Sequence, residues 1–192
     1  MDYALAIDGT PETIPGGSAV LLLHPSTAET DRIDTEFLST DTDRCLVVST
    51  RTTAREVKQK LDYYGVDTSS ASILDTRSVE RGLSRRNAED IHYVSAPDDV
   101  DGIVAAVETF LTEHDGKRRV SFDSMSELAY YAGTDRAVDA LERIADLLAA
   151  HDAVGLFHAD VQVHDEATLD RFREHCDGVV ELDEDGTITA DF

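Results

Sequence analysis

The stretch GGSAVLLLHPSTAETD, residues 16–31, determines the fold that we expect for the whole chain. Small residues lead into five consecutive apolar residues, 19–23, and His24-Pro25 ends the run. A continuous apolar run of this length is typical of a strand buried on both faces, as in parallel sheets. A polar loop follows, and Ile33 and Phe37 then recur at helical spacing. The stretch therefore predicts a strand, a tight loop and a helix.

The same alternation of strand and helix continues to the end of the chain. Further strands are expected at residues 45–49, 72–75, 91–94, 119–123, 153–157 and 179–182, and helices at 53–64, 99–111, 125–131, 135–150 and 166–175. This order predicts one α/β domain over residues 1–192, with a mostly parallel sheet covered on both faces in three layers. The turn Asp183–Gly186 predicts a C-terminal antiparallel hairpin, and residues 4–7 predict one edge strand.

Charge is the strongest compositional signal. The 192 residues include 40 acidic and 17 basic residues, which gives a net charge of −23, and only Lys58, Lys60 and Lys117 are lysines. Because the acid is dispersed over the chain, we expect an anionic surface suited to a halophile's cytosol, where molar salt screens self-repulsion. An ordinary acidic protein would leave the lysine deficit unexplained. Nucleic acid is not an expected partner, since no basic stripe offsets repulsion from phosphates.

The sequence also predicts a cytoplasmic location. No apolar run approaches the ~20 residues that span a bilayer, so no membrane partner is expected. The N-terminus lacks the basic segment of a secretory signal. Cys45 and Cys176 follow no spacing pattern and are interpreted as free thiols in a reducing compartment.

Four landmarks, in this order, carry a resemblance to a known family. They are the strand, loop and helix at 20–38, the segment TTAREVKQKLDYYGVD, the strand RRVSFDS, and the ending AVGLFHADVQVHDEATLDRFREHCDGVVELDEDG. The order resembles the RecA/KaiC-like branch of P-loop ATPases, in a reduced form like that of an uncharacterised haloarchaeal family. The resemblance implies that residues 24–31 occupy the P-loop position and that Asp123 corresponds to the acid that helps to bind Mg²⁺.

The groups that such ATPases need are absent. Aligning GxxxxGK[ST] after Leu23 places Glu29, Thr30 and Asp31 at the second Gly, the Lys and the Ser/Thr. One carboxylate 4 Å from a phosphate charge costs about 4 kcal/mol at an effective dielectric of 20. The glutamates that KaiC-like ATPases place after the second strand are replaced by Ser49-Thr50-Arg51. ATP hydrolysis is therefore not expected, and the sequence assigns no catalytic residue.

A second interpretation keeps a ligand in the crevice at the strand C-termini. Its residues would be Thr27, Thr30, Arg51, Asp123 and Ser124, with ATP and Mg²⁺ as cofactors under this interpretation alone. A simpler account lets Asp123 and Ser124 cap the following helix and Arg51 pair with a nearby acid.

Arginines and histidines provide the remaining candidates. The candidates for binding a partner are Arg77, Arg81, Arg85 and Arg86, which could pair with carboxylate or phosphate groups, or could neutralise acids in a solvated loop. The histidine spacings match no zinc signature, so no metal site is expected, and His158 is interpreted as a structural, hydrogen-bonded residue.

Three functions remain open at this stage. The favoured hypothesis is a non-catalytic RecA/KaiC-like domain that acts by binding a protein partner, or by self-association, in regulation or signalling. The rival is a divergent nucleotide-binding protein or ATPase that uses the crevice. The third is a structural subunit of a larger assembly.

Overall fold

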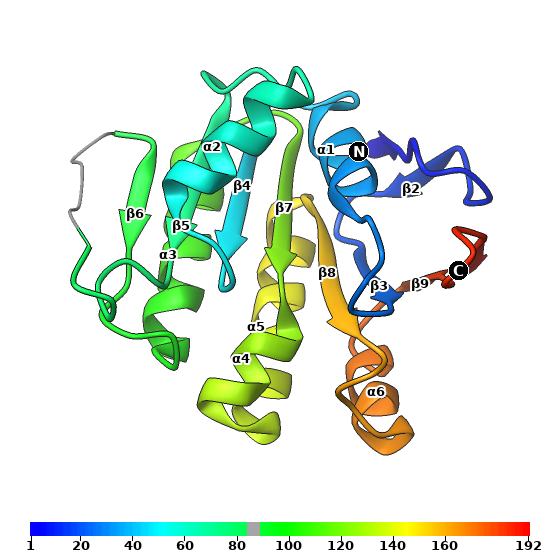
Figure 1. Ribbon diagram of the computed structural model, residues 1–192. Coiled ribbons are helices and arrows are strands. Elements are labelled where there is room, and N and C mark those ends of the chain that lie inside the picture. The colour runs from blue at the N-terminus through cyan, green and yellow to red at the C-terminus, as the bar shows by residue number, and fades with distance from the viewer. Residues whose placement is uncertain (84–88) are drawn as a thin grey trace.

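The protein is an eight-stranded, mostly parallel sheet between two layers of helices (Figure 1). The computed structural model describes residues 1–83 and 89–192. The strands of the large sheet, in spatial order, are β10 (Ile188–Asp191), β9 (Gly178–Leu182), β3 (Ala19–His24), β8 (Val154–Asp160), β7 (Arg118–Asp123), β4 (Arg44–Ser49), β5 (Ala71–Asp75) and β6 (Ile91–Tyr93). The helices are α1 (Asp31–Ser39), α2 (Ala54–Tyr63), α3 (Val100–Glu113), α4 (Met125–Ala132), α5 (Thr134–His151) and α6 (Glu166–Arg173). The predicted α/β fold is confirmed.

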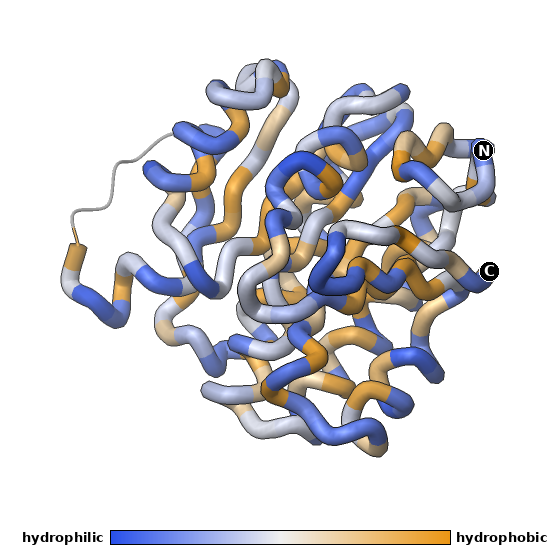
Figure 2. The backbone as a smooth tube through the Cα atoms, turned by 45° about the vertical axis from the view of Figure 1, so that its right-hand side comes forward, coloured by the Kyte–Doolittle hydropathy of each residue, from blue (hydrophilic) through white to orange (hydrophobic). Residues whose placement is uncertain are grey.

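Strand β3 lies inside the sheet and is buried along its whole length. It pairs in parallel with β8 and β9, for example Leu21 with Phe157 and with Val179. Leu21 and Leu23 face the core formed with α3, α4, α5 and α6. Val20 and Leu22 face the second core, formed with α1 and α2. The apolar run is continuous because both faces of the strand are covered (Figure 2).

Two of the expected helix starts are confirmed in detail. Thr53 and Glu56 form a capping box at the start of α2. Asp99 caps α3 by accepting a hydrogen bond from the Gly102 backbone N–H at 3.0 Å. The C-terminal hairpin is also present, because β9 and β10 pair in antiparallel fashion.

The N-terminal segment differs from the prediction of one edge strand at residues 4–7. Strands β1 (Asp2–Ala4) and β2 (Thr13–Pro15) form a separate antiparallel pair. The segment packs on the core because the Arg119 guanidinium lies over the rings of Tyr3 and Phe37, at 5.3 and 4.9 Å. Its Nη2 also donates a hydrogen bond of 2.6 Å to the Ala4 carbonyl. A buried side chain on β7 therefore holds the segment, which local sequence does not reveal.

Gly155 of β8 packs against Leu148 of α5 and Phe157 of its own strand. A methyl group at this position would lie 2.6 Å from Leu148 Cδ1 and 2.9 Å from a ring carbon of Phe157. In a packed interior such contacts force neighbouring side chains or the backbone to shift.

We expect Gly155→Ala to lower the free energy of unfolding by about 1–3 kcal/mol, the usual cost of overpacking a core. Urea denaturation followed by circular dichroism measures the change. An unchanged midpoint would show that α5 can move away from β8 without loss of packing.

Candidate functional site

A crevice of about 440 Å³ opens at the edge where β4 and β7 end. Ligands of open parallel sheets bind at this carboxyl edge. Four of the five residues proposed from sequence line the crevice: Thr27, Thr30, Arg51 and Asp123. Segments far apart in the chain therefore meet here, as the order of elements predicts.

The fifth residue, Ser124, is buried and has a structural role. Its hydroxyl accepts a hydrogen bond from the Glu127 backbone N–H at 3.3 Å and so caps α4. Its own N–H donates to Thr50 Oγ1 at 2.7 Å. The peptide bond between Asp123 and Ser124 is cis. The expected cap is thus supplied by Ser124 alone, because Asp123 turns toward the crevice.

Arg51 and Asp123 face each other inside the crevice. Arg51 Nη1 lies 3.5 Å from Asp123 Oδ1, and the Arg51 side chain is 44% exposed. A half-exposed pair at this distance is a weak contact, since water competes for both charges. The pair leaves the guanidinium within reach of the crevice and partly neutralises Asp123.

Lys60 is the crevice residue that sequence reasoning missed. It reaches α1 from α2, and its Nζ lies 2.8 Å from Asp34 Oδ2 and 3.6 Å from Asp31 Oδ1. Desolvation lowers the pKa of Lys60, but attraction to Asp34 outweighs it and the pKa rises above its usual value. The signal in the sequence was its rarity as one of three lysines.

Asp34, on α1, is completely buried and is the centre of a polar cluster beneath the crevice. Its Oδ1 accepts hydrogen bonds from His158 Nε2 at 3.2 Å and from the Ser121 hydroxyl, while Oδ2 receives Lys60. Desolvation by itself would raise the pKa of Asp34. The opposing effects of Lys60 and His158 are together larger, so the pKa lies well below its usual range. Asp34 is therefore ionised and links α1 to α2, β7 and β8.

Two histidines lie next to this cluster. The rings of His24 and His158 meet edge to face, with centroids 5.7 Å apart. Burial lowers the pKa of His24, whose Nδ1 lies 3.0 Å from the Pro25 carbonyl oxygen. His158 is buried and hydrogen-bonded to Asp34, in line with a structural histidine. Within the described part of the chain, no group of three His, Cys, Asp or Glu side chains is arranged to hold a metal ion.

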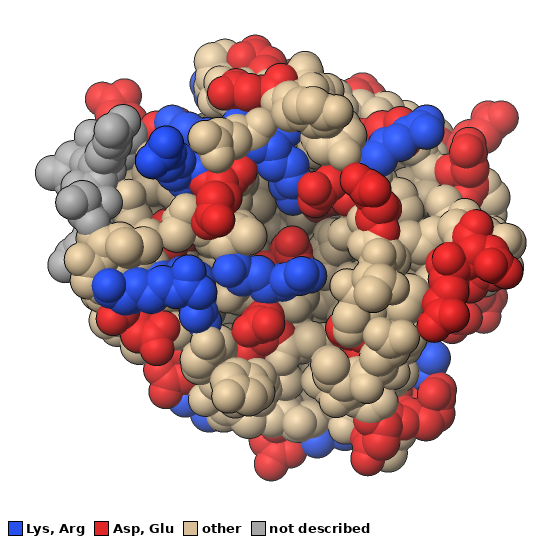
Figure 3. Space-filling view, in the orientation of Figure 1, with Lys and Arg blue, Asp and Glu red and all other residues tan. Residues whose placement is uncertain are grey.

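The arginines expected to bind a partner separate into two groups. Arg77 is 8% exposed and lies over the Tyr131 ring at 4.8 Å, and Asp75 accepts its backbone N–H at 2.8 Å. Arg81 is exposed in the same segment. Arg85 and Arg86 lie outside the described residues. Figure 3 shows basic side chains in a band that runs from the left edge to the centre of this face, with acidic side chains above and below it.

The solved structures most useful for comparison share the fold at low sequence identity. A KaiC-like protein of Pyrococcus horikoshii is 15% identical, with 92% of this chain and 77% of that chain covered and a TM-score of 0.62. An uncharacterized protein of the same organism, in complex with an unknown peptide, is 17% identical, with 92% and 83% covered and a TM-score of 0.69. An ATPase from the type III secretion system of pathogenic bacteria is 13% identical, with 96% of this chain and 57% of the ATPase chain covered and a TM-score of 0.65.

The α/β fold of this chain is therefore the one found in these KaiC-like and ATPase structures. More particularly, the chain belongs to the family of unknown function DUF7090, whose model matches residues 1–192. No curated protein matches it. Among the described residues, no helix has the length and apolar character needed to cross a bilayer.

We expect Asp34→Asn to lower the free energy of unfolding by about 3–5 kcal/mol, because Lys60 would keep a charge without its buried partner. Guanidinium denaturation measures the loss. Asp41→Asn is the matched control, since Asp41 also pairs with a lysine, Lys117, but at the surface, where its removal changes stability little. Equal effects of the two substitutions would contradict a central role for Asp34.

The pH dependence of stability provides a separate test of Asp34. Its pKa is lowered in the folded protein, so its contribution is complete above the unfolded pKa of about 3.9 and is lost as pH falls below that value. We expect the stability difference between wild type and Asp34→Asn to be constant from pH 7 to 5 and to shrink below pH of about 4. A difference that stays constant down to pH of about 2 would show that Asp34 does not titrate in this way.

Proposed function

We propose that this chain is a non-catalytic RecA/KaiC-like domain of a halophile's cytosol that acts by binding a protein partner in regulation or signalling. The observation that carries the proposal is the ion pair between Lys60 and the buried Asp34. A lysine that reaches the crevice is held by carboxylates of the protein itself, Asp34 at 2.8 Å and Asp31 at 3.6 Å. Its charge is therefore not available to a polyphosphate.

The other charges of the crevice support the same proposal. Glu29, Asp31 and Glu56 line it together with Asp123, against Arg51 and Lys60. Four carboxylates and two cations therefore line the crevice, which leaves it with two negative charges in excess. A site that binds ATP and Mg²⁺ needs cations for the phosphates and a hydroxyl for the metal. Here Thr30 stands in the place of the lysine and Asp31 in the place of the hydroxyl. The alternative, a divergent nucleotide-binding protein, is favoured by one observation, the opening of about 440 Å³ beside Thr27 and Thr30.

Thermal melting in molar KCl with ATP and Mg²⁺ distinguishes the two functions. We expect no shift of the melting temperature, whereas a ligand at about 100 times its dissociation constant would add about 2.7 kcal/mol of stability. ATP turnover measured in the same samples should equal the uncatalysed rate.

The control pair is Arg51→Ala and Arg55→Ala. Arg51 lines the crevice, while Arg55 is exposed on the same helix-start segment and lies outside it. A dose-dependent shift in the wild type that is lost in Arg51→Ala but kept in Arg55→Ala would overturn the non-catalytic proposal in favour of nucleotide binding.

A further inference from the structure

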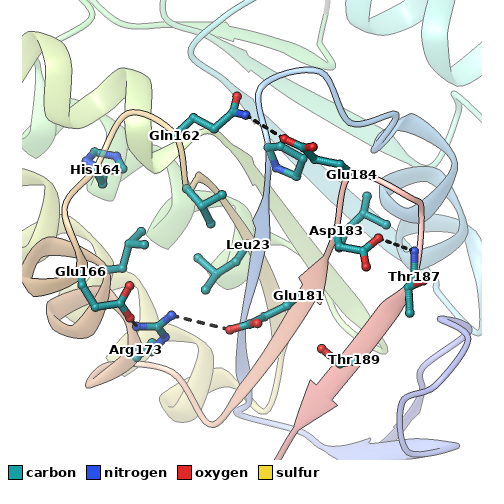
Figure 4. A pocket seen from close by; sticks show the side chains of 14 residues that line it. Leu23, Gln162, His164, Glu166, Arg173, Glu181, Asp183, Glu184, Thr187 and Thr189 are labelled. Atoms are coloured by element: carbon teal, nitrogen blue, oxygen red, sulfur yellow. Dashed lines mark hydrogen bonds and ion pairs between the residues drawn. The ribbon is translucent and has the colours of Figure 1, made fainter.

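A second cavity, of about 580 Å³, lies on the other side of β3 from the crevice residues, between α6 and the β9–β10 hairpin. We call it the hairpin groove. Its apolar lining consists of Leu23, Pro25, Val161, Leu169 and Leu182. Figure 4 shows Leu23 at the centre of the groove, with polar side chains around it. A volume of this size is within the range of natural ligand sites.

The rim of the hairpin groove is acidic. Glu166, Glu181, Asp183 and Glu184 line it, and Arg173 is the one Lys or Arg among the described lining residues. Arg173 is already held by acids of the chain, with its Nη1 2.7 Å from Asp170 Oδ1 and its Nη2 3.6 Å from Glu181 Oε1. The four carboxylates of the rim therefore carry more negative charge than Arg173 can neutralise.

Two rim carboxylates differ in how they are used. Asp183 accepts backbone N–H groups of Asp185 and Thr187, at 2.9 and 2.8 Å, and so holds the hairpin turn. Glu184 is exposed, and among the described residues its Oε1 receives one long hydrogen bond, of 3.4 Å, from Gln162 Nε2. Glu184 is therefore the rim acid most available to a cation from outside.

One wall of the groove is an exposed apolar loop. Val161, between β8 and α6, lines the groove and is 38% exposed, and Val163 of the same loop lies outside the lining and is 60% exposed. Ser126 of α4 holds the loop in place, because its Oγ contacts both the Asp160 backbone N–H and His164 Nε2 at 2.9 Å. Exposed apolar side chains on a held loop, next to an apolar floor, are a feature of protein docking sites.

We infer that the hairpin groove binds a segment of a partner protein in which an apolar side chain lies next to Lys or Arg. The apolar side chain would cover Leu23 and Val161, and the cation would pair with Glu184 and Glu181. Charge complementarity selects this occupant, since an acidic segment would meet an uncompensated acidic rim. The inference rests on the proposed function, because it names the partner class and the surface used.

A random peptide library displayed on phage and selected on the wild-type protein tests the inference. We expect the enriched peptides to carry Leu, Met or Phe beside Lys or Arg. A selected peptide, labelled with fluorescein, is then measured by fluorescence polarisation from 0.2 to 2 M KCl. Its affinity should fall with salt without vanishing, because apolar contacts survive the screening of ion pairs.

Two pairs of variants locate the binding. Val161→Lys removes an apolar wall residue and adds a repelling charge, while Val163→Lys makes the same change two residues away, outside the lining. Glu184→Lys reverses the charge of the free rim acid, and Glu174→Lys does so at an exposed position outside the groove. We expect Val161→Lys and Glu184→Lys to lower the affinity for the peptide by about tenfold or more, and the control variants to lower it by less than about twofold.

Three results would overturn the inference: no enriched peptides, enriched peptides without the basic and apolar pattern, or equal binding by the groove variants and their controls. Peptides whose binding is lost only on Arg81→Glu would place docking at Arg81, and the assignment to the hairpin groove would be wrong while the proposed function stands. Failure of the proposed function itself is seen separately, in the titration with ATP and Mg²⁺.

Discussion

The buried carboxylate of Asp34 is the constraint on which the arrangement of the crevice depends. One side chain on α1 contacts Lys60 of α2, Ser121 of β7 and His158 of β8. A charge in this position is expensive to desolvate and is retained only when its partners are precisely placed. Helix α1 follows directly from the loop after β3, so the same contacts also fix the loop that would otherwise approach a ligand.

The same constraint determines how charge is balanced at the carboxyl edge of the sheet. Lys60 compensates the acids that α1 brings to the crevice, Asp31 and Asp34. Arg51 is paired with Asp123 in the same way, although more weakly. Arg51 and Lys60 offset part of the charge of the four crevice carboxylates, and two negative charges stay in excess. The rim of the hairpin groove has four carboxylates against Arg173 alone among the described lining residues, which is why we propose that a partner docks there.

Much of the fold could be predicted from sequence because its signals are local. The apolar run 19–23 and the helix starts expected at residues 53 and 99 each depend on a few neighbouring residues, and all three are confirmed. The structure shows a capping box of Thr53 and Glu56 at one start and an Asp99 cap at the other. The N-terminal pair β1–β2 could not be predicted, because Arg119 holds it from more than a hundred residues away. Four of the five residues proposed from sequence line the crevice, because they lie at or after strand ends, while the fifth, Ser124, caps α4. Lys60 was not proposed, because it approaches the crevice from the next helix.

The sequence by itself determined the α/β class, the order of elements, the anionic surface and the absence of the phosphate-binding motif. These properties depend on composition and on periodicity along the chain. Only the tertiary structure decided which charges neutralise one another and which stay open to a partner. Asp34 and Lys60 are 26 residues apart, and Asp34 and His158 are 124 apart, so their pairing exists only after the sheet has formed. The free energy of a buried charge depends on distances of a few ångströms, and sequence spacing does not record such distances.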